Sequence, residues 1–200
     1  MMAIKPPYAL NGCHVLEAYD RYEDLLVTWV EPDRDLRMSK PLLAERFCRL
    51  KRLCEPKAFS ALALIWIVSN FVTDERRALA GFPCCPPDPV TSRLLAVAFT
   101  ASDRIELARA RYESALGGPQ APKKTGMYRQ RTSRFLDAGE TFGLVVLEDE
   151  TDKAGGKRVH ATPKLNELIL GTGEDVAMLA AVRLQSELSS FIDPGADGSR

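Results

Sequence analysis

The sequence has no excess of charge of either sign and no apolar segment long enough to cross a membrane. Its 200 residues include 27 Lys and Arg and 27 Asp and Glu, so the formal net charge is zero. The longest apolar segment, residues 58–72, has 15 residues, whereas a transmembrane helix needs about 20. A histone-like protein would carry a large excess of Lys and Arg, so the composition argues against that class. We expect a globular cytoplasmic protein with no secretory signal and no membrane partner.

Cysteine and histidine are too few and too poorly spaced for a typical metal site. The sequence has five cysteines and two histidines, and no two cysteines have the C-x-x-C spacing. Structural zinc sites draw their ligands from such clusters. Cys84 and Cys85 are adjacent in a proline-rich segment, which is a poor geometry for a mutual disulfide. We predict reduced thiols and no metal ion, with a thiol-based redox sensor as the alternative.

The sequence also lacks the motifs of common enzymes. Residues 118–125 approach a phosphate-binding P-loop but have no second glycine at the position where that motif needs one. No G-x-S-x-G nucleophile elbow is present. Glu148 and Glu150 fall in a polar turn, where solvated charges are expected. The sequence therefore predicts a protein that is not an enzyme and has no cofactor.

Apolar residues recur at helical spacing through most of the chain. We expect helices at 15–30, 41–53, 56–80, 101–116, 127–141, 163–170 and 175–192. Ser102 can cap the fourth of these helices, behind a buried apolar segment at 90–99. Two β-prone runs, 144–147 and 157–161, flank a glycine-bearing connection and predict a β-hairpin. The expected fold class is mainly α with one β-hairpin.

Charge is separated along the chain even though the total is zero. Residues 93–134 carry nine basic and three acidic side chains, a balance of +6, and residues 137–200 carry twelve acidic and six basic ones, a balance of −6. Donor side chains crowd the first half of the expected helix at 127–141. A helix that reads the major groove of DNA needs such donors on its exposed face.

Residues 131–162 combine a helix that ends in glycine, an apolar strand, a polar turn and a basic strand that leads into Thr-Pro. This segment resembles the recognition helix and wing of winged helix-turn-helix transcription regulators, above all the MarR-like group. The matching residues are Ser133, Arg134, Phe135, Leu136, Asp137, Ala138, Glu140, Gly143, Leu144, Val145, Val159, Ala161, Thr162 and Pro163. Gly139 departs from the pattern, because the family normally has a core leucine there.

The resemblance implies a winged helix-turn-helix unit with flanking helices and a role in transcription regulation. We predict sequence-specific DNA binding through a recognition helix near 127–141 and a wing near 145–161. The expected DNA-binding residues are Lys123, Lys124, Tyr128, Arg129, Gln130, Arg131, Thr132, Arg134, Lys153, Lys157 and Arg158. The arginines of the helix should lie exposed on the side of the wing. The alternative is a winged-helix module that binds an acidic protein and no DNA.

These features divide the chain into segments with different expected roles. The segments are an N-terminal helical region for core or dimerisation at 1–81, a Pro-rich linker at 82–92, the winged-helix unit at 93–170, a C-terminal helix for packing or dimerisation at 171–192 and a disordered tail at 193–200. The expected partners are double-stranded DNA and a second copy of the chain. A small-molecule effector between residues 58–72 and the winged-helix unit is left open, and Trp66 and Phe71 are interpreted as core.

Overall fold

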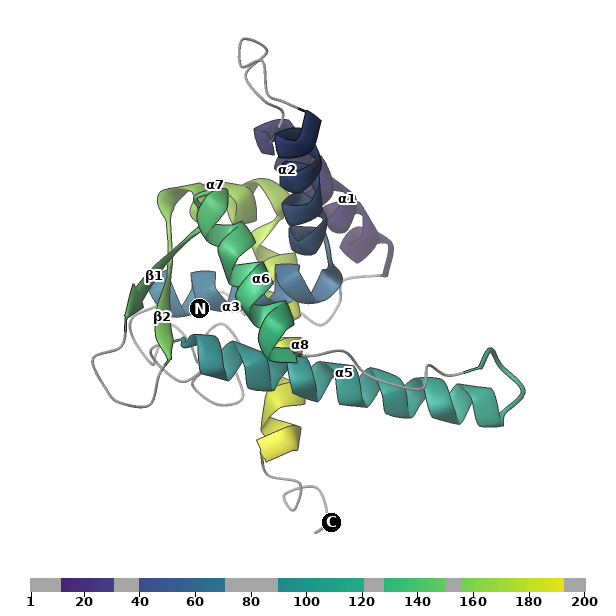
Figure 1. The fold of residues 1–200 in the computed structure, drawn as a ribbon. Coiled ribbons are helices and arrows are strands. Elements are labelled where there is room, and N and C mark those ends of the chain that lie inside the picture. The colour runs from purple at the N-terminus through teal and green to yellow at the C-terminus, as the bar shows by residue number, and fades with distance from the viewer. Residues whose placement is uncertain (1–11, 31–39, 71–89, 121–127, 150–155, 193–200) are drawn as a thin grey trace, which may run out of the picture.

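The computed structural model describes residues 12–30, 40–70, 90–120, 128–149 and 156–192, which hold seven helices and two strands. These elements are α1 (Gly12–Val30), α2 (Lys40–Leu53), α3 (Pro56–Asn70), α5 (Ser92–Ala115), α6 (Tyr128–Thr141), β1 (Val145–Asp149), β2 (Lys157–Ala161), α7 (Pro163–Thr172) and α8 (Glu174–Ile192). Figure 1 shows α6 crossing the body of the protein, with the hairpin on one side. The prediction of a mainly α fold with one β-hairpin is confirmed.

Helix α5 is longer than the sequence analysis expected. It runs without interruption over 24 residues, because no glycine or proline stands between Ser92 and Ala115 to end it. Its N-cap is Thr91, whose side chain accepts a hydrogen bond from the backbone N–H of Leu94 at 3.1 Å. Ser102 is buried in the middle of the helix. The expectation that Ser102 caps a separate helix is therefore wrong.

The other boundaries differ by a few residues or fall outside the described ranges. Helix α7 continues through Gly171 to Thr172 and ends at the positive-φ residue Gly173, where the sequence analysis expected it to stop at Gly171. Three expected features lie outside the described residues: the final turns of the apolar helix after Asn70, most of the Pro-rich linker, and the tail at 193–200.

A single hydrophobic core joins the N-terminal, central and C-terminal helices. Helix α3 lies at its centre, with buried residues on all of its sides, which is typical of a helix covered all round. Helix α3 packs most extensively against α8, and it also contacts α7, β2 and α2. Trp66 of α3 is buried, as expected, whereas Phe71 lies outside the described residues. Helices α1, α2 and α3 are therefore part of the same packing unit as the helices that follow.

The hairpin is extended by a short third piece of chain. Strands β1 and β2 are antiparallel, with Val145 opposite Ala161 and Asp149 opposite Lys157. Thr91 pairs with Arg158 on the other edge of β2, and the backbone N–H of Val159 donates to the carbonyl of Val90 at 2.9 Å. The chain just before α5 thus joins β2 as an additional extended segment. The sequence analysis missed this pairing.

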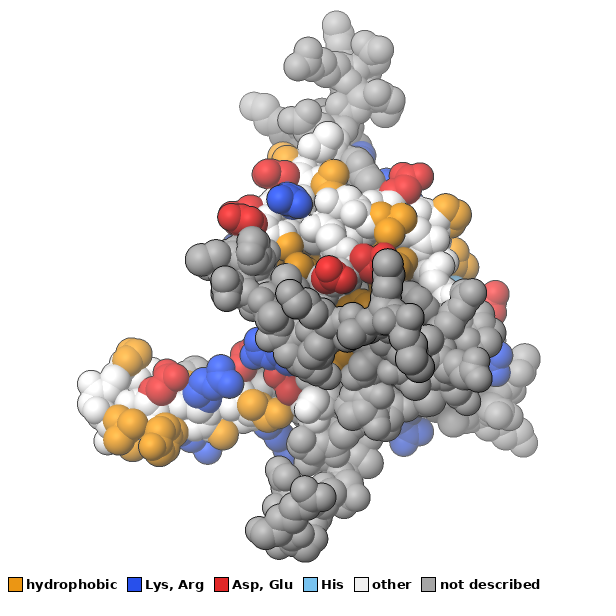
Figure 2. Space-filling model, turned by 180° about the vertical axis from the view of Figure 1, so that it is seen from behind, with side chains coloured by type: hydrophobic (Ala, Val, Ile, Leu, Met, Phe, Trp, Pro, Cys, Tyr) orange, Lys and Arg blue, Asp and Glu red, His pale blue; other side chains and the backbone are white. Residues whose placement is uncertain are grey.

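The second half of α5 projects from the body of the protein (Figure 1). No residue from Arg104 to Ala115 is buried, and Tyr112 and Leu116 are about 70% exposed (68% and 70%). Figure 2 shows hydrophobic, basic and acidic side chains together on this projecting half.

Gly139 allows α6 and β1 to approach each other closely. A Cβ atom at this position would lie 3.0 Å from Cγ2 of Val145. A leucine, the residue that MarR-like regulators normally have here, would therefore have to displace the Val145 side chain or the strand that carries it.

We predict that Gly139→Leu lowers the free energy of unfolding. Overpacking of a core costs about 1–3 kcal/mol, more than the roughly 0.8 kcal/mol gained by removing glycine from a helix. Urea unfolding followed by circular dichroism measures the difference. The neighbouring variant Glu140→Leu, at an exposed position, is the control and should stay within about 0.5 kcal/mol of the wild type. Equal stability of Gly139→Leu and the wild type would contradict the close approach.

Candidate nucleic-acid interface

Helix α6 has one exposed face that changes charge along its length. The exposed residues recur every three or four positions, as on one side of a helix, and are Gln130, Ser133, Arg134, Asp137, Glu140 and Thr141. The first half of this face carries donors and the second half carries two carboxylates. Only the first half therefore has the chemistry to contact DNA.

Arg131, predicted as an exposed DNA-binding residue, is held by ion pairs within the protein. Its guanidinium lies 3.2 Å from both carboxylate oxygens of Asp103 and also pairs with Glu55. Burial lowers the pKa of Arg131, but the hydrogen bond to Glu55 and the charges of Glu55 and Asp103 outweigh it, so the pKa lies above its ordinary value. The expectation that Arg131 is exposed and free to bind DNA is therefore wrong. Its two charged partners come from outside α6: Asp103 from α5 and Glu55 from the link between α2 and α3.

The same carboxylate also holds Lys57. Asp103 is 8% exposed and pairs with the Lys57 ammonium, which lies 2.7 Å from Glu106 as well. Three elements meet at this point: the first turn of α3, the middle of α5 and the first turn of α6. We call this group the Asp103 cluster, and its members are Glu55, Lys57, Asp103, Glu106 and Arg131.

Of the other DNA-binding residues predicted in α6 and just before it, one is buried and four have side chains that lie outside the described part of the structure. Thr132 is 3% exposed, so its side chain faces the interior, and its assignment as a DNA-binding residue is corrected. The side chains of Tyr128 and Arg129 lie outside the described part of the structure, as do Lys123 and Lys124.

One of the predicted wing residues, Lys157, lies beside α6. A groove of about 720 Å³ separates the exposed face of α6 from the start of α5 and the hairpin. We call it the wing-side groove, and its charged lining residues are Arg93, Asp137, Glu140 and Lys157. Lys157 lies 3.6 Å from Asp149 and stays about half exposed. Arg158 is exposed, and Lys153 lies outside the described residues.

Helix α2 covers the other flank of the second half of α6. The Arg49 guanidinium donates a 2.6 Å hydrogen bond to the Thr141 hydroxyl and lies 3.6 Å from Asp137. Sequence reasoning missed this contact because nothing in the local pattern of either helix indicates the other. Arg49 offsets part of the negative charge that α6 would present to phosphate.

The basic block at 93–134 is more dispersed than its position in the sequence suggests. Arg93 lines the wing-side groove, whereas Arg109 and Arg111 are exposed on the projecting half of α5. With Arg131 also neutralised, the positive charge does not gather wholly on the face of α6. The described part of the block therefore coincides only partly with the exposed face of α6.

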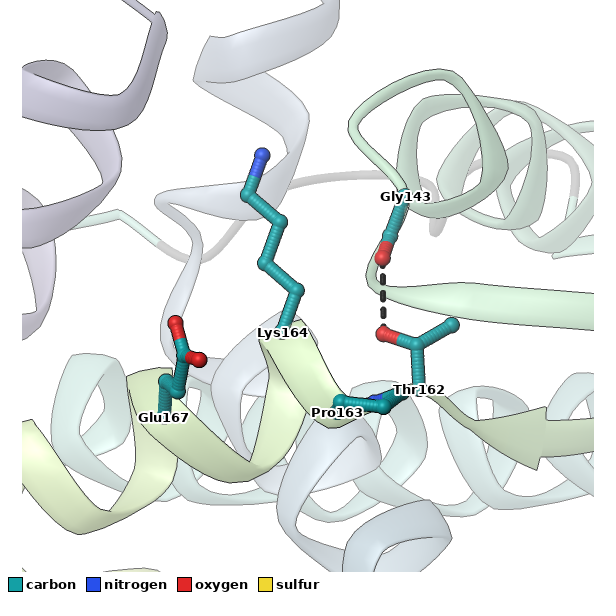
Figure 3. Close-up of a pocket in the computed structure, with 5 residues that line it drawn as sticks. All are labelled: Gly143, Thr162, Pro163, Lys164 and Glu167. Carbon is teal, nitrogen blue, oxygen red and sulfur yellow. Dashed lines mark hydrogen bonds between the residues drawn. The ribbon is translucent and has the colours of Figure 1, made fainter.

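A pocket lies at the C-terminal end of α6, at the corner where α6, β1 and α7 meet (Figure 3). Gly143 turns the chain with a φ of +66°, and the Thr162 hydroxyl donates to its carbonyl at 2.7 Å. The Lys164 ammonium donates to the carbonyl of Phe142 at 3.0 Å. These bonds fix the direction in which the hairpin leaves α6.

Other candidate chemistry is sparse in the part of the chain that the structure describes. Within it, no three His, Cys, Asp or Glu side chains are grouped so that they could hold a metal ion, and none of the described helices is long and apolar enough to span a membrane. His160 lies 3.4 Å from Glu148 with its side chain 43% exposed.

No family profile, curated protein or solved structure matches this chain. The resemblance to MarR-like regulators therefore stays a hypothesis that the geometry of the chain itself must support.

We predict that Asp103→Asn destabilises the protein. Removing one partner of a buried ion pair costs about 3 kcal/mol, and here it leaves Lys57 and Arg131 with only the more exposed carboxylates of Glu106 and Glu55. Urea unfolding measures the loss. Glu106→Gln is the matched control, since it removes a carboxylate from the same lysine at a site that is 54% exposed, and exposed pairs contribute only about 0–1 kcal/mol. Equal losses in the two variants would contradict a central role for Asp103.

The two described free thiols should differ in reactivity. Cys48 is exposed and Cys54 is half-buried. Burial, with a smaller effect of Glu23, raises the pKa of Cys54 to about 11. Only about one Cys54 in a thousand is then a thiolate at pH 8, and the thiolate is the reactive form.

We therefore expect iodoacetamide to alkylate Cys54 at least about tenfold more slowly than Cys48 at pH 8. The rate at Cys54 should keep rising with pH up to about 11, because its thiol still loses protons there. Peptide mass spectrometry over time measures both rates. Equal rates, or a rate at Cys54 that stops rising below about pH 9, would contradict the raised pKa.

Proposed function

We propose that this chain is a sequence-specific winged-helix DNA-binding protein that regulates transcription, with α6 as its recognition helix. The order of elements carries the proposal: α3, the extended segment at Thr91, α5, α6, β1 and β2. In winged helix-turn-helix units, a short strand ahead of the second helix pairs with the last strand of the wing. The pairing of Thr91 with Arg158 corresponds to that contact.

The first half of α6 supplies the base-reading groups in this proposal. Gln130 and Arg134 are exposed there, and glutamine and arginine side chains can each make two hydrogen bonds to a base edge. Arg93 and Lys157, in the wing-side groove, would contact phosphates and set the orientation of the protein on the duplex.

A homodimer in the cytoplasm is part of the same proposal. A two-fold dimer would place two recognition helices about one helical turn apart on a palindromic site. Helix α8 buries its apolar stripe within the chain, so we assign the pairing surface to the N-terminal helices. These helices expose the large apolar side chains Val27, Leu42 and Phe47.

A second candidate is a winged-helix module that binds a protein. The observation in its favour is the pair of carboxylates, Asp137 and Glu140, on the exposed face of α6. They would repel phosphate and an acidic protein alike, so they favour a protein partner that offers hydrogen-bond donors in place of the acidic protein of the sequence-based alternative.

The DNA proposal predicts that Arg134→Ala weakens binding to a duplex selected from fragments of the protein's own genome. The loss of one base contact should cost about 1–3 kcal/mol, and fluorescence anisotropy at several salt concentrations measures it. Affinity of the wild type should fall steeply with salt, since each phosphate contact contributes about −0.9 to the logarithmic slope.

Arg183→Ala is the control for this measurement. It removes the same charge from an exposed position on α8, and it should leave the affinity unchanged. Arg131→Ala is not used because it would disturb the Asp103 cluster. If the wild type binds no duplex at about 50 mM salt, the DNA proposal is wrong and the protein-binding alternative is favoured.

A further inference from the structure

The projecting half of α5 carries an apolar stripe that the structure leaves largely exposed. Its residues recur at intervals of three and four, which places them on one side of the helix, and they are Ile105, Ala108, Tyr112, Ala115 and Leu116. Ile105 is half-buried and the other four are exposed. Figure 2 shows hydrophobic side chains gathered toward the outer end of this half. An apolar stripe at this spacing is typical of a helix that packs against another structure.

The stripe fits the heptad pattern of a coiled coil, in which positions a and d are apolar. With Ile105 and Tyr112 at a, the residues at d are Ala108 and Ala115. Positions e and g flank such a stripe on its two sides, and they select the partner through interhelical ion pairs. In this stretch they are Arg104, Arg109, Arg111 and Leu116, all of them exposed. Every charged residue at these positions is therefore an arginine.

These arginines argue against a second copy of this chain as the partner of the stripe. In a parallel pair, position g faces position e of the next heptad, so Arg104 would lie near Arg109 of the second copy. In an antiparallel pair, e faces e and g faces g, so arginine again meets arginine. Like charges brought together at an interface disfavour the pairing. A helix with carboxylates at its e and g positions would instead form ion pairs with them.

The apolar residues favour a helix over a flat anionic surface. Phosphates of a nucleic acid would engage the arginines but would leave Tyr112 and Leu116 uncovered. The small residues Ala108 and Ala115 alternate along the stripe with the larger Ile105 and Tyr112. Large side chains of a second helix can enter the spaces beside the alanines, as knobs enter holes in a coiled coil. A lipid surface offers no such periodic match.

The projecting half of α5 is held in helical form by the other half of the same helix. A helix of about 12 residues is marginal in isolation. Here the preceding turns of α5 are anchored in the core by Leu95, Ala98, Phe99 and Ala101, all of which are buried. A partner would therefore meet a preformed helix and would not have to order it, which lowers the entropic cost of binding.

We propose that the projecting half of α5 pairs with an acidic amphipathic helix of a different protein, as a short two-stranded coiled coil. The partner helix would place large apolar side chains against Ala108 and Ala115 and carboxylates beside Arg109 and Arg111. No residue of the projecting half lines the wing-side groove. The pairing therefore does not depend on DNA binding by α6, and the two proposals fail independently when the pairing is measured without DNA.

Fluorescence anisotropy of a labelled peptide, titrated with the full-length protein, tests the pairing. The acidic peptide has about three heptads, with leucine at a and d and glutamate at e and g, and its matched control has lysine in place of every glutamate. We expect the acidic peptide to bind at least about tenfold more tightly than the lysine peptide, because only its charges are opposite to those of the arginines. Equal affinity for the two peptides, or no binding of the acidic one, would overturn the proposal.

Charge reversal on the protein locates the contact. Arg109→Glu and Arg111→Glu should each weaken binding of the acidic peptide by about fivefold, since each replaces an ion pair with a contact between like charges. The double variant should prefer the lysine peptide. Arg183→Glu reverses a charge on α8, where the side chain is 66% exposed, and as the control it should change nothing. If both reversals in α5 behave like Arg183→Glu, the peptide binds elsewhere and the proposal is wrong.

Tyr112→Ser tests the apolar part of the contact. It should weaken binding of the acidic peptide by about tenfold, because it removes an apolar side chain that the pairing buries. Unchanged binding would mean that the arginines act without helix pairing, and it would contradict the proposal. Urea unfolding curves verify that each variant is folded.

The same variant distinguishes the other possible occupants of the stripe. Sedimentation velocity of the wild type and of Tyr112→Ser shows whether the stripe joins two copies of the chain. Co-sedimentation of both proteins with phosphatidylglycerol vesicles shows whether it binds an anionic membrane. We expect the substitution to change neither result. A dimer or a vesicle complex that Tyr112→Ser dissociates would overturn the proposed partner.

Discussion

The buried carboxylate of Asp103 is the constraint on which the arrangement of the central helices depends. A desolvated charge must be paired, and this one takes its partners from two other helices, Lys57 of α3 and Arg131 of α6. The pairing sets the position of α6 relative to α3 and α5. Apolar packing alone, such as that of Phe99 on Phe135, would bring α5 and α6 together but would select one alignment of the two helices less strictly.

The ion pairs of Arg131 limit what α6 can do at its surface. A guanidinium that stabilises the fold is not available to a nucleic acid without a loss of stability. The donors of the described part of α6 that remain at its surface are thereby Gln130 and Arg134, both of which are exposed on its first half. The proposed DNA binding depends on this narrow set of exposed donors.

Sequence reasoning succeeded where the signal is local. Strand β2 was predicted at its observed residues because a glycine-bearing turn and a β-prone run mark it, and α6 was predicted to within one residue. The predicted division of α5 was wrong because Ser102 is a good cap in isolation, but serine inside a helix costs less than about 0.7 kcal/mol relative to alanine. The pairing of Thr91 with β2 was missed because the segment is too short to show the alternation of apolar and polar residues that marks a strand. Thr132 was assigned to the surface because helical periodicity does not identify which face is covered.

The sequence by itself determined the fold class, most helix positions, the hairpin and the donor-rich start of α6, because spacing, turn residues and composition are local properties. Only the tertiary structure decided which donors are free. Arg131 and Arg134 are three residues apart on one helix, yet one is paired with Asp103 and Glu55 and the other is exposed. The difference comes from α5 and from the link between α2 and α3, which reach α6 from distant parts of the chain. Long-range pairing of that kind leaves no mark in the local pattern of residues.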